Sequence, residues 1–483
     1  MKATTRSFVV LAIALAAGAC SNFFDVPQTN QPTLDDLLAH PTRDKLAAAA
    51  NGIFSGASGD IQSLIWRLGS MGREGINLSG NNTPDYSEPY FGPLSGSGFG
   101  GALWGGRYAN IRSINIYMQA LGRTTELSPG EIAASRGMAQ TFKALAFLYI
   151  IETRGPLGAP VDVDRPVTAP PAPFVSEDSV YGYIIGLLDS GRTNLATANT
   201  DLAAFPFPMP ATYLNGFFDP GEFALFNRAL AAKAEVFRAT ALNGCHGTPA
   251  NCWNAAETAL AASFYQPGDT TQFQRGVNFE FSTDPGDGTN DLSDPLNGNT
   301  YFALPDFITQ ADTQVGGQPD LRALSKIVPS QDTQRLGGIP IHGELKFTVY
   351  FSNGAVDPGH PIPIIRGEEL ELLDAEAQIG LNNLAAANTI LNLVRKASGN
   401  LPADTLSGGS PKAAYIAELL YNRRYSLMWE QGTRWIDARR YGLLGTIPTD
   451  IPNGNVPPGN VPSIMPIPDN ECNARGLSTG CAP

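Results

Sequence analysis

Apolar side chains recur at helical spacing in the last quarter of the chain. Residues 366–399 contain two such stripes, separated near Gly380, and each would line one face of a helix. This pattern predicts a helical hairpin. A third helix is predicted to begin at Ser410 and Pro411, because serine suits a helix cap and proline suits the first helical position. Three helices joined by short turns bury their apolar stripes against one another and against further helices.

The same spacing predicts further helices upstream. Their ranges are 33–54, 138–151, 223–242 and 253–264, with another that begins at residue 61 and one that is capped at Ser176. Residues 266–360 differ, because Gly, Asp, Asn and Pro are frequent there and strand-like runs occur only at 277–281 and 346–351. The sequence therefore predicts a mainly α protein with a loop-rich subdomain that carries a few short strands.

Residues 71–106 show no sustained periodicity and are rich in Gly, Asn, Ser and Pro. Their aromatic and amide side chains include Asn81, Asn82, Tyr86, Tyr90 and Phe91. Long irregular stretches in a compact protein are often functional, and a disordered linker rarely contains so many aromatic rings. We therefore expect a surface loop with a binding role.

Three glycines in this loop have the spacing of a dinucleotide-binding turn. Gly96, Gly98 and Gly101 match that pattern, but no apolar strand precedes them and Pro93 stands where the strand would end. We therefore reject a nucleotide site and interpret these glycines as part of a close-packed surface loop.

The first 19 residues have the pattern of an export signal. Lys2 and Arg6 precede an apolar run at 8–17, and small residues lead directly to Cys20. The apolar run is too short to span a bilayer. A cysteine in this position resembles the bacterial lipobox, so Cys20 is predicted to be lipidated; the alternative is an ordinary secreted protein.

Two groups of residues near the C-terminus, taken together, resemble signatures of the RagB/SusD family of outer-membrane lipoproteins. The first group is Arg366, Glu369, Ala375, Glu376 and Ala377, followed by Asn392, Val394 and Arg395. The second group is Asn422, Arg423, Trp429, Glu430, Arg434, Asp437 and Arg440. Further similarity extends from Cys20 to the tail at 465–473.

The resemblance implies a scaffold of tetratricopeptide-like helical hairpins and a single SusD-like domain over residues 20–483, after a signal peptide at 1–19. Within that domain we expect an N-terminal helical part at 20–265, a loop-rich insertion at 266–360 and a C-terminal helical part with a tail at 361–483. No sequence repeat of the tetratricopeptide period is visible, so the hairpin scaffold follows from the resemblance.

The resemblance also implies a function. Members of the family capture glycans at the cell surface and pass them to a SusC-like TonB-dependent barrel in the outer membrane, on which the lipoprotein sits as a lid. We expect no cofactor, and the sequence identifies no metal ligands. The expected location is the outer membrane, with a lipid anchor and the protein facing the cell exterior.

Sugar rings stack on flat apolar faces and hydrogen-bond to amides and carboxylates. The side chains predicted to contact such a ligand are Trp66, Asn81, Asn82, Tyr86, Tyr90 and Phe91, although Trp66 is equally compatible with the core. A peptide or another nutrient is an alternative ligand. An exported glycoside hydrolase and a purely structural scaffold are alternatives of other classes.

Four cysteines remain after Cys20, and an exported protein places them where disulfides form. Three pairings exist, and the local ones, Cys245 with Cys252 and Cys472 with Cys481, are preferred. A metal site that includes His246 is a weaker alternative, because the spacings fit no zinc pattern.

The remaining chemistry favours binding over catalysis. The chain carries a formal net charge of −13 and no basic block, which disfavours a nucleic-acid partner. Its 4 histidines lie far apart in the sequence, and neither a zinc-protease motif nor a nucleophile elbow occurs. The aspartates at 284, 287, 291 and 294 raise the alternative of bound calcium, but they fit no EF-hand loop, and a solvated acidic loop is favoured.

Charged residues near the end of the chain are predicted to form structural ion pairs. Glu430, Arg434, Asp437 and Arg440 follow one another at spacings of three or four residues, so one continuous helix would align them as a ladder. We interpret this ladder as a network that holds the last helix against its neighbours; the alternative is a ligand site.

Overall fold

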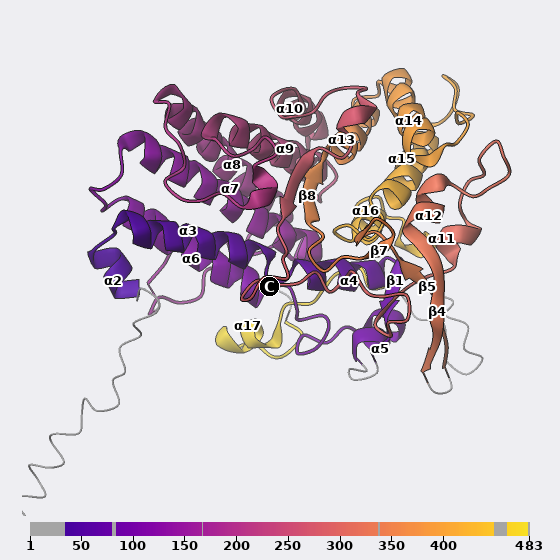
Figure 1. Cartoon of the computed structure of the whole chain (residues 1–483), viewed down its shortest axis with the longest axis horizontal. Coiled ribbons are helices and arrows are strands. Elements are labelled where there is room, and N and C mark those ends of the chain that lie inside the picture. The colour runs from indigo at the N-terminus through magenta and orange to yellow at the C-terminus, as the bar shows by residue number, and fades with distance from the viewer. Residues whose placement is uncertain (1–33, 80–83, 167, 337–338, 449–460, 482–483) are drawn as a thin grey trace, which may run out of the picture.

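The computed structural model describes residues 34–79, 84–166, 168–336, 339–448 and 461–481, and helices dominate it (Figure 1). Cys20 and the predicted signal segment lie outside the described residues. The helices of the N-terminal half are α2 (Leu34–Ala39), α3 (Arg43–Ser58), α4 (Ile61–Met71), α5 (Pro84–Phe91), α6 (Gly105–Leu121), α7 (Pro129–Arg154), α8 (Glu177–Thr200), α9 (Pro220–Ala239) and α10 (Pro249–Ala261). Those that follow are α11 (Asp306–Thr309), α12 (Leu321–Lys326), α13 (Gly367–Gly380), α14 (Leu384–Gly399), α15 (Lys412–Ser426), α16 (Thr433–Arg440) and α17 (Asp469–Ala474).

The long helices pack side by side in an arc. Helix α3 contacts α6, and contacts continue from α6 to α7, α8, α9, α10 and α13, and then to α14 and α15 (Figure 1). Apolar side chains fill the space between them, and Phe142 and Phe147 of α7 are fully buried. The predicted mainly α fold of helical hairpins with a few short strands is confirmed.

Local sequence explains where several helices begin. Helix α7 starts with a complete capping box between Ser128 and Glu131, and the Ser176 hydroxyl accepts from the Ser179 amide at the start of α8. The predicted single helix over 33–54 is wrong, because the chain forms α2 and α3 instead. Pro41 lies between them, and Thr42 caps α3.

Short strands form small sheets beside the helices. They are β1 (Gly75–Asn77), β2 (Gly276–Phe279), β3 (Tyr301–Ala303), β4 (Ile327–Leu336), β5 (Ile339–Phe347), β6 (Phe351–Ser352), β7 (Ala355–Val356) and β8 (Ile362–Arg366). The largest sheet has the order β1-β3-β5-β4, and its β1–β3 pairing places Ile76 opposite Phe302. Segment 71–106 is therefore not wholly irregular, because it supplies both β1 and α5.

The chain leaves helical geometry between α15 and α16. Trp429, Gln431 and Gly432 have positive φ angles of 58°, 57° and 65°, which no α-helix accommodates. A β-carbon at Gly432 would lie 2.0 Å from the Leu68 β-carbon, so the close approach of α4 requires glycine there. The continuous helix on which the predicted ion-pair ladder depended does not exist.

Only part of the ladder forms. Arg440 pairs with Asp437 at 2.9 Å, whereas Arg434 contacts Asp306 at 3.1 Å and Glu430 pairs with Arg366 at 2.9 Å. The four residues still join the last helix to its neighbours, but through partners distant in sequence. None of the described helices is both long and apolar enough to cross a membrane.

Candidate ligand-binding site

Two of the rings predicted to contact ligand lie in the interior. Tyr90 is 1% exposed, its hydroxyl donates to the Gly75 carbonyl at 2.8 Å, and the Arg73 guanidinium lies 4.1 Å from its ring centre. Trp66 is 7% exposed and packs edge-on against Phe99 at 5.6 Å. Both rings stabilise the base of segment 71–106, and neither has a free face for a sugar.

The other predicted contacts lie closer to solvent. Tyr86 and Phe91 of α5 are partly buried against a small apolar cluster that contains Ile76 and Phe302. Asn81 and Asn82 lie outside the described residues. Tyr86 and Phe91 therefore lie closer to solvent than Tyr90, which is buried in the same cluster.

A hollow of about 650 Å³ opens where segment 71–106 ends and α6 begins. We call it the Trp104 pocket. Its walls come from the start of α6, the proline-rich connector at 160–172 and the C-terminal residues 468–475, and they include Trp104, Tyr108, Arg112, Arg165, Glu471 and Arg475. A hollow of this size accommodates a small oligosaccharide.

Flat apolar groups line much of this pocket. The Trp104 and Tyr108 rings lie 4.8 Å apart, and Phe174 stacks on Trp104 at 6.0 Å. Prolines of the connector and Pro468 contribute further rigid faces. The Tyr108 hydroxyl donates to the Pro160 carbonyl at 2.9 Å, which fixes the ring, and burial raises the pKa of that hydroxyl well above its usual value. The arrangement suits stacking against a sugar ring.

The charged side chains of the pocket differ in how far they are paired. Arg475 donates twice to one oxygen of Glu471, at 2.8 and 2.6 Å, so these two charges compensate each other. Arg165 donates to the Pro170 carbonyl and lies 3.6 Å from the exposed Asp162. Arg112 is exposed and has neither an ion pair nor a hydrogen bond with any residue that the structure describes.

A second hollow, of about 410 Å³, lies between α3, β2 and the loop at 281–288. We call it the Phe54 pocket. Phe54 and Phe281 supply aromatic surface, and the carboxylates of Glu280 and Asp287 are also part of the lining. No lysine or arginine is found among its described lining residues. The two hollows therefore resemble each other in aromatic content and differ in the sign of their charge.

Carboxyl groups with raised pKa values do not line either hollow. Burial, and next the charge of Asp374, raise the pKa of Glu257 to about 8, and burial raises that of Glu371 to about 7. Glu371 and Asp374 of α13 act on Tyr265, whose hydroxyl donates to Asp374 at 2.8 Å, and Glu257 of α10 interacts with the same Asp374. Their environment is a helix interface, which is a common structural cause of such shifts.

The acidic loop at 284–294 is partly committed to structural contacts. Asp294 forms an ion pair with Lys346, and the Asp291 carboxylate accepts from the Thr289 hydroxyl at 2.8 Å. These contacts hold the loop against β5 and leave the preferred interpretation, a solvated acidic loop, in place.

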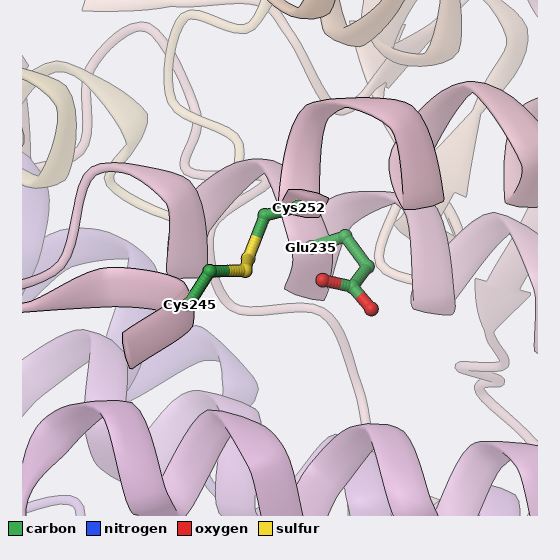
Figure 2. Close-up of side chains that lie close together, drawn as sticks. All are labelled: Glu235, Cys245 and Cys252. Atoms are coloured by element: carbon green, nitrogen blue, oxygen red, sulfur yellow. A yellow bond between two sulfur atoms is a disulfide. The ribbon is translucent and has the colours of Figure 1, made fainter. Parts of the chain in front are cut away.

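Both local disulfides favoured from the sequence are present, Cys245–Cys252 and Cys472–Cys481. The Glu235 carboxylate lies beside the first of them (Figure 2). These three residues are close enough to hold a metal ion, but a disulfide has no thiolate to offer as a ligand. His246 contacts Asp178 at 3.1 Å instead. The disulfide has a structural role, because it ties the turn that contains Cys245 to α10.

Sequence reasoning missed the three arginines of the Trp104 pocket. Tyr108 and Arg112 are four residues apart on α6, a spacing that places them on one helical face and that was visible in the sequence. Arg165 and Arg475 come from segments that only the tertiary structure brings to this face.

The sequence matches no family model and no curated protein. Solved structures do match over most of the chain. A SusD superfamily protein from Bacteroides vulgatus is 16% identical, with a TM-score of 0.64, and the match covers 91% of this chain and 98% of that one. A SusD-like carbohydrate-binding protein from Bacteroides fragilis is 14% identical, with a TM-score of 0.65 and coverage of 90% and 98%.

A laminarin-binding SusD-like protein is 15% identical, with a TM-score of 0.63, and the match covers 91% of this chain and 99% of that one. Identities this low establish the fold. They agree with the resemblance carried by the C-terminal residues, and the chain therefore has the fold of the SusD superfamily.

Proposed function

We propose that this protein binds oligosaccharides at the cell surface and that the Trp104 pocket forms part of the binding site. The observation that carries the proposal is the pocket itself, a hollow of about 650 Å³ lined by Trp104, Tyr108 and several prolines. Its place on a SusD-like fold supports the same assignment, since structures with this fold include a laminarin-binding protein.

We further propose that the protein is a lipoprotein anchored through Cys20 in the outer membrane, facing the cell exterior. It delivers its ligand to a SusC-like TonB-dependent barrel. The export pattern of residues 1–19 and the resemblance of the C-terminal motifs support this role. Membrane attachment through a lipid requires no spanning helix.

We propose that the protein binds glycans without cleaving them. Hydrolysis of a glycosidic bond requires two carboxyl groups that flank the bond. The described lining of the Trp104 pocket contains a single carboxylate, Glu471, which is paired with Arg475. Capture without cleavage is the function that this lining supports.

The set of proposed ligand contacts differs from the predicted one, because two of the predicted rings are buried. Tyr90 and Trp66 act as supports, whereas Tyr86 and Phe91 remain proposed contacts on the outer side of segment 71–106. Asn81 and Asn82 remain proposed contacts from the sequence alone. Tyr108, which is partly exposed, is added as the stacking residue, and Trp104, which is 5% exposed, supports it from the core side.

The test is a binding screen of the detergent-solubilised full chain against neutral and acidic oligosaccharides and peptides. Reducing-sugar release is followed in the same wells. Tyr108→Ala is expected to weaken glycan binding about tenfold, because a stacked ring contributes about 1.5 kcal/mol. Phe281→Ala is the matched control, since it removes an aromatic ring from the other hollow.

Saturable binding that is weakened by Tyr108→Ala and unchanged by Phe281→Ala supports the proposal. Release of sugar would assign the protein to the hydrolases instead. Binding of peptides alone would keep the fold and replace the ligand.

A further inference from the structure

We propose that the Trp104 pocket selects oligosaccharides that carry a carboxylate, with Arg112 as the residue that recognises it. The inference rests on the proposed function and specifies its ligand class as an acidic glycan whose sugar units are uronic acids. The pocket, its unpaired guanidinium and its contrast with the Phe54 pocket carry the argument.

Arg112 is the cation of the pocket that is free to bind. Its guanidinium is exposed, and no described residue pairs with it, whereas Arg475 is held by Glu471 through two hydrogen bonds. Arg165 retains part of its capacity, because its carboxylate neighbour Asp162 lies 3.6 Å away and is exposed to solvent. With Glu471 compensating Arg475, the lining carries a positive excess in a chain of net charge −13.

The position of Arg112 suits a ligand that stacks. Arg112 follows Tyr108 by four residues on α6, so both side chains project from the same face of that helix into the pocket. A sugar ring on the Tyr108 side would place a carboxylate attached to that ring near the guanidinium. Arginine presents donors in a planar fork that matches both carboxylate oxygens.

The start of α6 adds to this preference. Trp104 caps the helix without a side-chain hydrogen bond, and the first turn contains no acidic residue. Gly105 lines the pocket, and a β-carbon placed there would meet no other atom within 4 Å. The positive end of the helix dipole faces an open wall at Gly105 and adds to the attraction for a negative ligand, while the Asp60 carboxylate beside Gly106 is paired with Arg107.

The Phe54 pocket provides the internal contrast. It also offers aromatic surface, but Glu280 and Asp287 give its described lining a negative charge. A carboxylate-bearing ligand is repelled there and attracted at the Trp104 pocket, so the charge of the ligand discriminates between the two hollows.

The experiment compares two probes of equal length, an oligogalacturonate and a neutral galacto-oligosaccharide, by calorimetry with the full chain in detergent. We expect the acidic probe to bind about tenfold more tightly, and the preference to shrink as salt is added, because screening weakens exposed charge pairs. Arg112→Ala is expected to lower affinity for the acidic probe about tenfold and to leave the neutral probe within about twofold.

Two further variants complete the design. Arg112→Lys keeps the charge but loses the fork, so an intermediate loss is expected. Arg136→Ala is the matched control, because Arg136 is an exposed arginine on α7 that lines neither pocket. Circular dichroism of each variant confirms that the fold is retained.

The outcomes separate the inference from the function on which it rests. Equal affinity for both probes, unchanged by Arg112→Ala, overturns acidic selectivity and retains oligosaccharide binding. An acidic preference that survives Arg112→Ala overturns the role of Arg112. Absence of binding to the acidic probe overturns the inference, and the neutral probe then decides whether the proposed function survives.

Discussion

Arginines serve opposite purposes in two regions of this molecule. In the C-terminal core, Arg423 is fully buried, donates to Asp437 at 2.6 Å and lies 3.9 Å from Glu376. Arg366 in the same region pairs with Glu430 at 2.9 Å and with Glu368 at 2.5 Å. In the Trp104 pocket, Arg112 is exposed and unpaired with respect to the described residues. The first region is closed to ligand, and the second is open to it.

The difference shows which residues carry the resemblance to the SusD family. Arg366, Glu376, Arg423, Asp437 and Arg440 belong to the matched motifs, and all of them lie in the buried network. Although burial lowers the pKa of Arg423, the charges of Asp437 and Glu376 raise it above its usual value. The motifs thus record how the last helices are joined, and they contain no information about the ligand.

The largest expected effect is the loss of a buried partner. Arg423→Ala removes one of the two guanidinium groups that Asp437 and Glu376 share, and Arg440 remains as the other. Breaking a buried ion pair costs about 3–5 kcal/mol, so with Arg440 still present the free energy of unfolding should fall by about 3 kcal/mol, the lower end of that range. Urea unfolding of the variant and of Arg136→Ala measures it, and a loss below about 1 kcal/mol would show that the network is not structural.

The next effect concerns Glu74, which joins the same buried region. Its carboxylate accepts from the Trp429 amide at 2.9 Å, and burial raises its pKa to about 7. Between about pH 4.5 and 7 the folded state holds a proton that the unfolded state has released. Stability therefore falls as the pH rises through this window, by about 3 kcal/mol from this group.

Glu74→Gln removes that contribution. The expected result is a flatter dependence of the unfolding free energy on pH between 4.5 and 7 than in the unchanged protein, measured by urea unfolding at several pH values. Other buried carboxyls, such as Glu371, remain in both proteins and cancel in the difference. Identical slopes would contradict the raised pKa of Glu74.

A smaller effect is expected at Arg165. Its neighbour Asp162 is exposed and 3.6 Å away, so the guanidinium is only weakly held and contributes a second, weaker attraction for an acidic ligand. Arg165→Ala should lower affinity for the oligogalacturonate about threefold, less than Arg112→Ala does. The same titration measures both, and a reversed order would transfer the main recognition role to Arg165.

The smallest effect is expected on the stability of the pocket variants. Arg112 is exposed and makes no contact that folding requires, so Arg112→Ala should change the free energy of unfolding by less than about 0.5 kcal/mol. Thermal unfolding beside Arg423→Ala tests the contrast directly. A large destabilisation would place Arg112 with the structural arginines.

Much of the helical scaffold could be predicted, because apolar periodicity and capping residues act locally. Ser176 and the stripes on α13 and α14 indicated their helices directly. Pro41, which separates α2 from α3, is also a local signal, but the predicted single helix over 33–54 ignored it. The break between α15 and α16 was harder to predict, because the backbone at Gly432 is fixed by its contact with Leu68, far away in the sequence.

The candidate site also has features that the sequence predicted and features that it did not. The sequence alone identified an aromatic segment before α6 and a set of motifs that specify a SusD-like scaffold. It did not separate the buried Tyr90 from the accessible Tyr86, since both belong to one irregular segment and burial depends on β3 and its Phe302. Only the tertiary structure decided that Arg112, Arg165 and Arg475 meet in one pocket. The charge of a binding site depends on which side chains lie close together in space. The periodicity of apolar residues along the chain does not show which distant segments come together.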